Sequence, residues 1–151
     1  MNMKSEPTKR QNLNRRYMKL EAWQRGMDLF EMVLKATTGV TDFKLRSQIV
    51  DAAQSVSANI PEGYCRRSLP EYLQLPYTAK GSLGETLARA IGLQRVALMG
   101  SAQFEEIDVL HYEVENKLLG LIRSLEAKRA DGSWDDALPA PHHPPSTIHP
   151  P

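Results

Sequence analysis

Apolar residues recur at steps of three and four in four separate segments of this chain, at about 19–37, 42–67, 68–99 and 103–129. This spacing places them along one face of an α-helix, where they can pack together. The four stripes are Leu20, Trp23, Met27, Phe30 and Leu34; Leu45, Ile49, Ala52, Val56 and Ile60; Tyr72, Ala79, Leu83, Leu87, Ile91 and Leu98; and Phe104, Ile107, Val114, Leu118, Leu121 and Leu125. The pattern predicts an all-α fold, an antiparallel up-down-up-down four-helix bundle with disordered termini.

The two ends of the chain lack this helical pattern. Residues 1–18 are polar and basic, and residues 131–151 hold six of the ten prolines and three of the four histidines. Such sequences bury too little apolar surface to offset the entropy lost when a chain is ordered. We therefore expect a flexible basic arm over 1–18, one four-helix bundle over 19–130 and a disordered Pro-rich tail over 131–151.

The net charge of +1 excludes a strong overall attraction to nucleic acid, although the charges are unevenly placed. Residues 1–20 carry six basic side chains against the single acidic Glu6, and residues 131–151 carry three aspartates and no Lys or Arg. Cys65 is the only cysteine, so no disulfide can form within the chain. No secretory signal and no apolar run of ~20 residues is visible. We expect a soluble cytoplasmic protein that makes no membrane contact.

Polar residues form a stripe of their own along the second helical segment, and a similar stripe runs along the third. The first stripe is Ser55, Asn59, Glu62 and Arg66, and the second is Thr78, Ser82, Glu85 and Arg89. Polar groups that are shut away from water must find hydrogen-bond partners. We predict a polar seam that hydrogen-bonds within the bundle or between subunits, formed by Ser55, Asn59, Glu62, Arg66, Ser82 and Glu85.

Glycine and proline mark the expected turns and irregularities. Gly39 is able to take a left-handed cap after the first segment, and Asp131-Gly132 is expected to end the fourth. Pro61 and Pro76 fall inside the second and third segments, where a proline removes a hydrogen bond and costs ~3 kcal/mol. Because the polar stripe continues beyond Pro61, we expect a kink there and not the end of the helix.

The sequence offers little for catalysis or metal binding. A bundle di-metal site needs a Glu from each of two helices and a Glu-x-x-His from each of the other two. Glu62 and Glu85 could supply the first pair, and Asp108 with His111 resembles one half of the second, but the first segment has no matching half. His111 is instead expected at the edge of the core, satisfied by a neighbour. We predict no enzyme, no metal and no cofactor, with a bundle metalloprotein as the last alternative.

Basic side chains indicate a different kind of function. Several basic residues of the arm and of the end of the second segment could contact phosphates, and an oligomer would multiply such contacts. The alternative is that these charges are only solvated or ion-paired. The predicted nucleic-acid contacts are Lys9, Arg10, Arg15, Arg16, Arg66 and Arg67.

Three blocks of residues resemble one protein family. The blocks are Leu20 to Trp23; Gln48, Ala52, Ser55, Asn59, Ile60, Glu62, Gly63 and Arg66; and Glu71, Tyr72, Ala79, Lys80, Gly81, Ser82 and Glu85. Over about 20–128 the chain is similar to the four-helix-bundle proteins encoded in 23S ribosomal RNA intervening sequences. The resemblance implies a bundle that assembles as a ring-like homopentamer and has no known enzymatic activity. A related bundle family serves diversity-generating retroelements as an accessory protein that binds a reverse transcriptase and nucleic acid.

The chain departs from the family pattern at three positions. The family usually has arginine in place of Asp51, alanine in place of Pro61 and an apolar residue in place of Pro76. The first change removes a positive charge from a surface that could meet RNA. This change argues against RNA binding at that surface. The resemblance as a whole and the basic residues named above lead us to expect a non-enzymatic homo-oligomeric scaffold or interaction protein associated with structured RNA. The alternative is a nucleic-acid-binding accessory protein of a reverse transcriptase.

Overall fold

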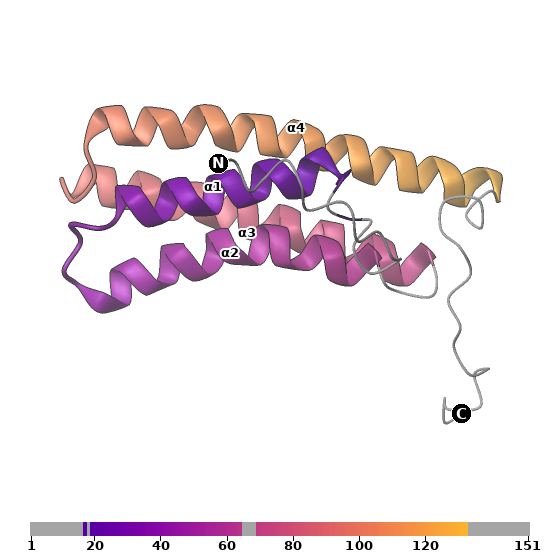
Figure 1. The fold of residues 1–151 in the computed structure, drawn as a ribbon, viewed down its shortest axis with the longest axis horizontal. Helices are drawn as coiled ribbons and strands as arrows, with labels where there is room; N and C mark the ends of the chain where they lie inside the picture. The colour runs from indigo at the N-terminus through magenta and orange to yellow at the C-terminus, as the bar shows by residue number, and fades with distance from the viewer. Residues whose placement is uncertain (1–16, 18, 65–68, 133–151) are drawn as a thin grey trace, which may run out of the picture.

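Four helices make up nearly all of the computed structural model, which describes residues 17, 19–64 and 69–132. They are α1 (Glu21–Ala36), α2 (Phe43–Tyr64), α3 (Leu69–Arg95) and α4 (Ser101–Asp131). Each helix packs on two others: α1 and α3 each contact both α2 and α4 (Figure 1). The predicted all-α up-down bundle is confirmed. The predicted tail from 133 onward and the predicted arm, apart from Tyr17, lie outside the described residues.

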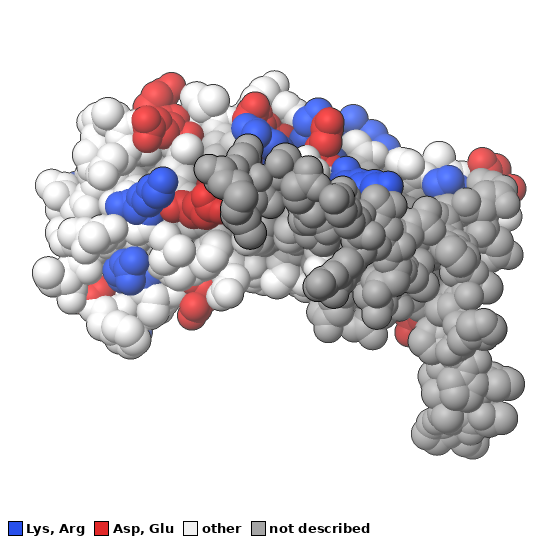
Figure 2. All heavy atoms as spheres, in the orientation of Figure 1, with Lys and Arg blue, Asp and Glu red and all other residues white. Residues whose placement is uncertain are grey.

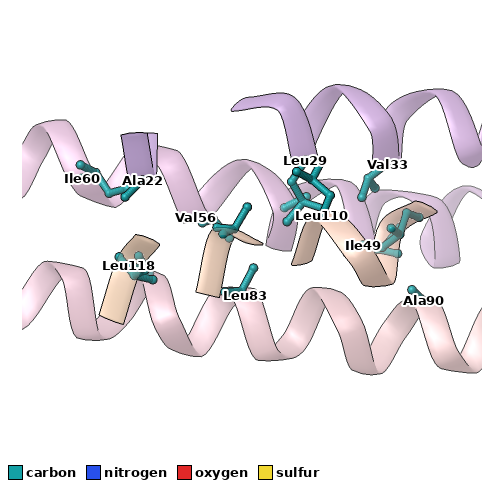
Figure 3. Close-up of a cluster of buried hydrophobic side chains, with 14 of the residues drawn as sticks. Ala22, Leu29, Val33, Ile49, Val56, Ile60, Leu83, Ala90, Leu110 and Leu118 are labelled. Carbon is teal, nitrogen blue, oxygen red and sulfur yellow. The ribbon is translucent and has the colours of Figure 1, made fainter. Parts of the chain in front are cut away.

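A single apolar core runs along the length of the bundle (Figure 3). Every helix contributes, and the fully or almost fully buried side chains include Leu29, Val33, Ile49, Val56, Ile60, Leu83, Ile107, Val114 and Leu118. Burying a Leu, Ile or Val side chain contributes about 1.5–3 kcal/mol relative to leaving it exposed. The predicted apolar stripes include three residues at one end of the bundle that are not buried: Leu45, Ile91 and Leu98 are about two-fifths exposed. These residues lie in the first turn of α2 and near or beyond the end of α3, where fewer neighbours cover them.

The end of α1 differs from the sequence expectation. Positive φ angles occur in the described residues only at Ala97 and Gly132, so the expected left-handed cap at Gly39 is wrong. Two threonine hydroxyls bind the last carbonyls instead. Thr37 Oγ1 donates to the Val33 carbonyl at 2.7 Å, and Thr38 Oγ1 donates to the Lys35 carbonyl at 3.0 Å. The backbone N–H groups of Thr37 and Thr38 donate to the same two carbonyls, so the end of α1 is capped by backbone and side-chain donors without a left-handed residue.

Neither internal proline ends its helix. The α2 backbone remains helical from Phe43 through position 61 to Tyr64. Pro76 is buried inside α3, which continues for many residues on both sides. At Pro76 the burial of the side chain offsets the lost hydrogen bond, so tertiary packing overrides local propensity there.

The turn between α3 and α4 is a Schellman motif. The Leu98 N–H donates to the Leu93 carbonyl at 2.8 Å, and the Ala97 N–H donates to the Gln94 carbonyl at 3.0 Å. Ala97, the residue after the helix end in this motif, has φ of 64°, a left-handed conformation that usually belongs to glycine. At the other end of α4, Gly132 forms a left-handed cap with φ of 75°, as the sequence predicted.

Candidate functional site: the polar seam and the charged surfaces

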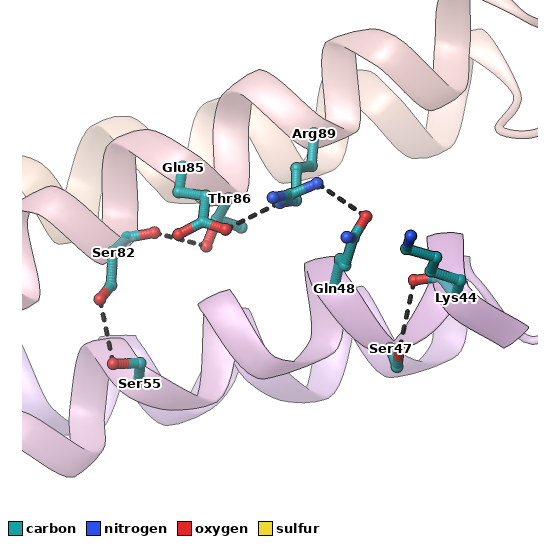
Figure 4. A network of polar contacts seen from close by, with 8 residues as sticks. All are labelled: Lys44, Ser47, Gln48, Ser55, Ser82, Glu85, Thr86 and Arg89. Carbon is teal, nitrogen blue, oxygen red and sulfur yellow. Dashed lines mark hydrogen bonds and ion pairs between the residues drawn. The ribbon is translucent and has the colours of Figure 1, made fainter.

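The polar seam joins α2 to α3 at the middle of the two helices (Figure 4). Ser82 Oγ donates to Ser55 Oγ at 3.0 Å. Asn59 Nδ2 lies one helical turn further along α2, and it donates to the Ser55 carbonyl at 2.6 Å and to Ser55 Oγ at 2.9 Å. All three side chains are partly exposed. The structure therefore brings Ser55, Asn59 and Ser82 together within one chain.

Arg89 forms a second polar link between the same helices. Its Nη1 donates to Gln48 Oε1 on α2 at 2.9 Å, and its Nε donates to Glu85 Oε2 on α3 at 2.8 Å (Figure 4). Glu85 thus orients Arg89 and does not itself reach α2 in these contacts. Gln48 was missed as a seam residue by the sequence reasoning. The signal was available, because Gln48 lies seven residues before Ser55 and so falls on the same helical face.

The two other predicted members of the seam are not described: nothing is known of the Glu62 side chain, and Arg66 lies in the undescribed connection between α2 and α3. Within the described residues, no three His, Cys, Asp or Glu side chains lie close enough together to hold a metal ion. What the described part of the seam offers chemically is hydrogen bonding and helix register, since its donors and acceptors face one another.

His111 does not lie at the edge of the core, contrary to the sequence expectation. Its side chain is only 7% exposed, among apolar residues of α4 such as Leu110 and Val114. Its buried Nε2 has no hydrogen-bond partner in the described part of the chain. The expected satisfying neighbour is therefore absent there, and His111 is a polar group held in an apolar setting.

A groove of about 480 Å³ lies between α1 and α4, and a smaller hollow of about 360 Å³ adjoins it. We call the two together the acidic groove. It is lined by Arg25, Asp28, Glu31, Met32, Lys35, Ala36, Gln103, Glu105, Glu106, Val109, Leu110 and Glu113. Arg25 bridges the groove, with Nη2 at 2.9 Å from Glu113 Oε1 and Nη1 at 3.1 Å from Asp28 Oδ2. The hydrogen bond to Glu113 raises the pKa of Arg25, so this cation stays charged.

Charge is divided along α4. Its first half carries Glu105, Glu106, Asp108, Glu113 and Glu115 and no Lys or Arg, whereas its second half carries the four basic residues Lys117, Arg123, Lys128 and Arg129 against the two acidic residues Glu126 and Asp131. Figure 2 shows basic side chains together with acidic ones over the side of the molecule where α4 runs. Lys128 and Arg129 lie in the last turn, where the helix dipole favours basic groups. We call the surface of Arg123, Lys128 and Arg129 the basic end.

Lys117 ties the beginning of α1 to α4. Its Nζ lies 2.5 Å from Glu21 Oε1, and the hydrogen bond from Lys117 lowers the pKa of Glu21. The six predicted nucleic-acid contacts, Lys9, Arg10, Arg15, Arg16, Arg66 and Arg67, lie outside the described residues. Their attachment points are nevertheless fixed: the beginning of α1, the end of α2 and the start of α3 lie toward the end of the bundle where α4 finishes (Figure 1).

One face of α3 is exposed and lined with small residues: Gly81, Gly84, Ala88 and Gly92. A Cβ added at any of the three glycines would meet nothing within 4 Å. Each glycine in a helix costs about 1 kcal/mol relative to alanine. Packing among the described residues gives no reason for these glycines. We call this surface the small-residue face.

The fold and the described surfaces define an all-α bundle protein whose seam holds helices together. The chain belongs to the 23S rRNA-intervening sequence protein family, whose model matches residues 18–120. Among solved structures it is similar to a protein of unknown function from the S23 ribosomal protein family of Bacteroides thetaiotaomicron. That match has 20% identity and a TM-score of 0.55, and it covers 74% of this chain and 98% of the other. It supports the fold alone.

No curated protein of established function matches the chain significantly. In the described part of the chain, no helix combines the length and the apolar character that a membrane crossing requires.

Proposed function

We propose that this chain is a non-enzymatic, homo-oligomeric scaffold or interaction protein that associates with structured RNA. The observation that carries the proposal is the small-residue face of α3. Three glycines there reduce the stability of the isolated helix, and no close packing among the described residues requires a glycine at these positions. Small residues let another backbone approach closely, and Tyr77 and Ile91 on α3 add exposed apolar surface.

The assembly that we propose is a homopentamer, in which α3 of each copy packs on a neighbouring copy. Light scattering at several concentrations tests it, with a mass close to five chains as the expected result. Gly84→Leu should dissociate the assembly while making the helix itself more favourable, because Leu has the higher helix propensity. Ala127→Leu on the exposed surface of α4 is the control and should leave the mass unchanged. A strict monomer at all concentrations would remove the scaffold proposal.

RNA association is supported by the basic end. Arg123 and Arg129 are exposed there, and the arm and the α2–α3 connection, with their predicted phosphate contacts, join the bundle toward the same end. Several copies in one assembly would present this surface repeatedly, which raises avidity without any new contact. We propose that the partner is structured RNA, recognised through its phosphates.

Binding of a labelled RNA hairpin over a salt series tests this proposal. Affinity should fall steeply with salt, because each phosphate contact releases counterions. Arg123→Gln with Arg129→Gln should weaken binding and reduce the slope. Arg95→Gln at the end of α3, near the opposite end of the bundle, is the control and should change neither. No measurable binding at low salt would end the RNA proposal and leave the scaffold proposal standing.

A further inference from the structure

The acidic groove between α1 and α4 is more than a row of surface charges, because its floor is apolar. Met32 contributes to both hollows, and Val109 and Leu110 line the larger one. Val109 is 55% exposed in the first half of α4, so it offers apolar surface to a ligand in the groove. Carboxylates stand around this floor from both helices.

The carboxylates of the groove are only partly neutralised. Arg25 is engaged by Asp28 and Glu113 on opposite walls. Within the described residues, Glu31, Glu105 and Glu106 form no ion pair. Glu106 lines both hollows, and so it lies where they meet. Such a surface favours a ligand that is basic, extended and carries an apolar side chain.

We propose that the acidic groove binds the basic amino-terminal arm, residues 1–16, of the same chain. The arm carries Lys4, Lys9, Arg10, Arg15 and Arg16 against the single acidic Glu6. It also carries Leu13 between its two basic pairs, an apolar side chain that suits the apolar floor of the larger hollow at Val109. The charge of the arm is therefore complementary to the charge of the groove.

The attachment point of the arm supports binding within one chain. The Tyr17 ring packs edge-on against the Trp23 ring with centroids 5.3 Å apart, so the arm begins beside the first turn of α1. Met32 lies about 17 Å along the helix from Glu21, at 1.5 Å per residue. Seven extended residues, from Arg10 to Tyr17, span about 23 Å. Lys9 and Arg10 can therefore reach the groove of their own copy, and the tether keeps their effective concentration high.

The inference does not depend on RNA binding or on the oligomeric state. A single exposed ion pair contributes little, so the binding must combine several pairs with the apolar contact. It should accordingly be sensitive to salt, because exposed charges are screened.

The test uses the full chain with a benzophenone amino acid in place of Leu13. After illumination at low salt, mass spectrometry should locate the main cross-link on groove residues of α1 and α4, with Asp28 and Val109 of the larger hollow foremost. Mixing isotopically labelled and unlabelled copies before illumination separates the possible occupants. Cross-linked peptides from one copy support the proposal, whereas peptides that mostly join two copies overturn it in favour of a neighbour's arm.

Two charge reversals complete the experiment. Glu106→Lys should lower the yield of the groove cross-link about threefold or more, because it replaces an attraction by a repulsion. Asp51→Lys changes the same charge on an exposed position of α2 and should leave the yield unchanged. High salt should lower the yield in the chain that carries the benzophenone amino acid and no charge reversal. Cross-links spread over the surface, or a groove cross-link that Glu106→Lys does not reduce, would overturn the proposal.

Discussion

Ser82 of α3 donates a hydrogen bond to Ser55 of α2 at 3.0 Å, and this contact lies near the middle of both helices. Ser55 Oγ also accepts from Asn59 Nδ2, so one hydroxyl joins three side chains. Apolar stripes allow neighbouring helices to slide by a turn, whereas paired donors and acceptors fit at one register. The polar seam thus fixes how α2 and α3 align.

Ser55→Ala tests this role. It removes the acceptor of two hydrogen bonds, and we expect the free energy of unfolding to fall by about 1 kcal/mol because the seam is only partly buried. Urea unfolding followed by circular dichroism measures the change. Ser47→Ala is the control: Ser47 Oγ donates only to the Lys44 carbonyl of its own helix, and its loss should be nearly neutral.

A double-mutant cycle isolates the contact between the two helices. Ser55→Ala and Ser82→Ala should be less than additive, with a coupling of about 0.5–1 kcal/mol. If the two changes in unfolding free energy are strictly additive, the hydrogen bond between the two hydroxyls does not stabilise the interface.

Ala97→Gly should stabilise the protein. Ala97 has φ of 64°, where a Cβ costs an L-residue about 1–2 kcal/mol, and glycine avoids that cost. Part of the gain is offset because glycine has more freedom in the unfolded chain. We expect a net increase of about 1 kcal/mol, seen as a higher urea midpoint at constant m. Gly132→Ala, at φ of 75°, is the matched reverse change and should destabilise the end of α4.

Tyr77 links α3 to α4 through its hydroxyl, which donates to Glu126. This hydrogen bond raises the pKa of Tyr77 above its ordinary value. Because the pKa of Tyr77 is higher in the folded state than in the unfolded state, the hydrogen bond stabilises the fold fully at a pH below the unfolded-state pKa. This stabilisation is lost as the pH rises through the folded-state pKa. Tyr77→Phe should therefore lower stability at neutral pH and remove this alkaline loss. Unfolding curves of both proteins between neutral and strongly alkaline pH measure the difference.

Tyr112→Phe is the control for the alkaline experiment, since Tyr112 is 65% exposed on α4. Its stability should follow that of the unsubstituted chain across the whole pH range. If Tyr77→Phe and Tyr112→Phe behave alike, the contact with Glu126 contributes nothing measurable.

Sequence patterning was sufficient for the helices because helical spacing reports burial directly. Val56, Leu83 and Leu118 all fall on predicted stripes and are buried. The same spacing predicted burial of Leu45 and Leu98, which are exposed. Periodicity does not reveal that a residue lies at the end of the bundle, where no neighbouring helix covers it. Ala97 gave no signal, since it lacks the glycine that usually marks a left-handed position.

The surfaces required more than periodicity. Ser55, Asn59 and Ser82 were predicted as a group from their helical faces alone, and the structure places them in contact. The acidic groove could not be foreseen in this way, because it forms where α1 meets α4 and no local pattern states which helices are neighbours. Arg25 and Glu113 are 88 residues apart in the sequence, yet they pair across it.

His111→Leu should make the protein more stable. The imidazole is 7% exposed, and its Nε2 finds no partner in the described part of the chain, so its burial carries a desolvation penalty of about 1–3 kcal/mol. Leucine offers a similar volume without polar atoms, and its burial adds apolar surface to the core beside Leu110 and Val114. We expect the free energy of unfolding to rise by about 1–2 kcal/mol in urea titrations.

His111→Gln separates the loss of polarity from the change of shape. It keeps an amide in the same apolar setting, so it should not reproduce the gain. A destabilised His111→Leu protein together with an unaffected His111→Gln protein would contradict the argument, because it would mean that the imidazole makes a polar contact that the amide can replace.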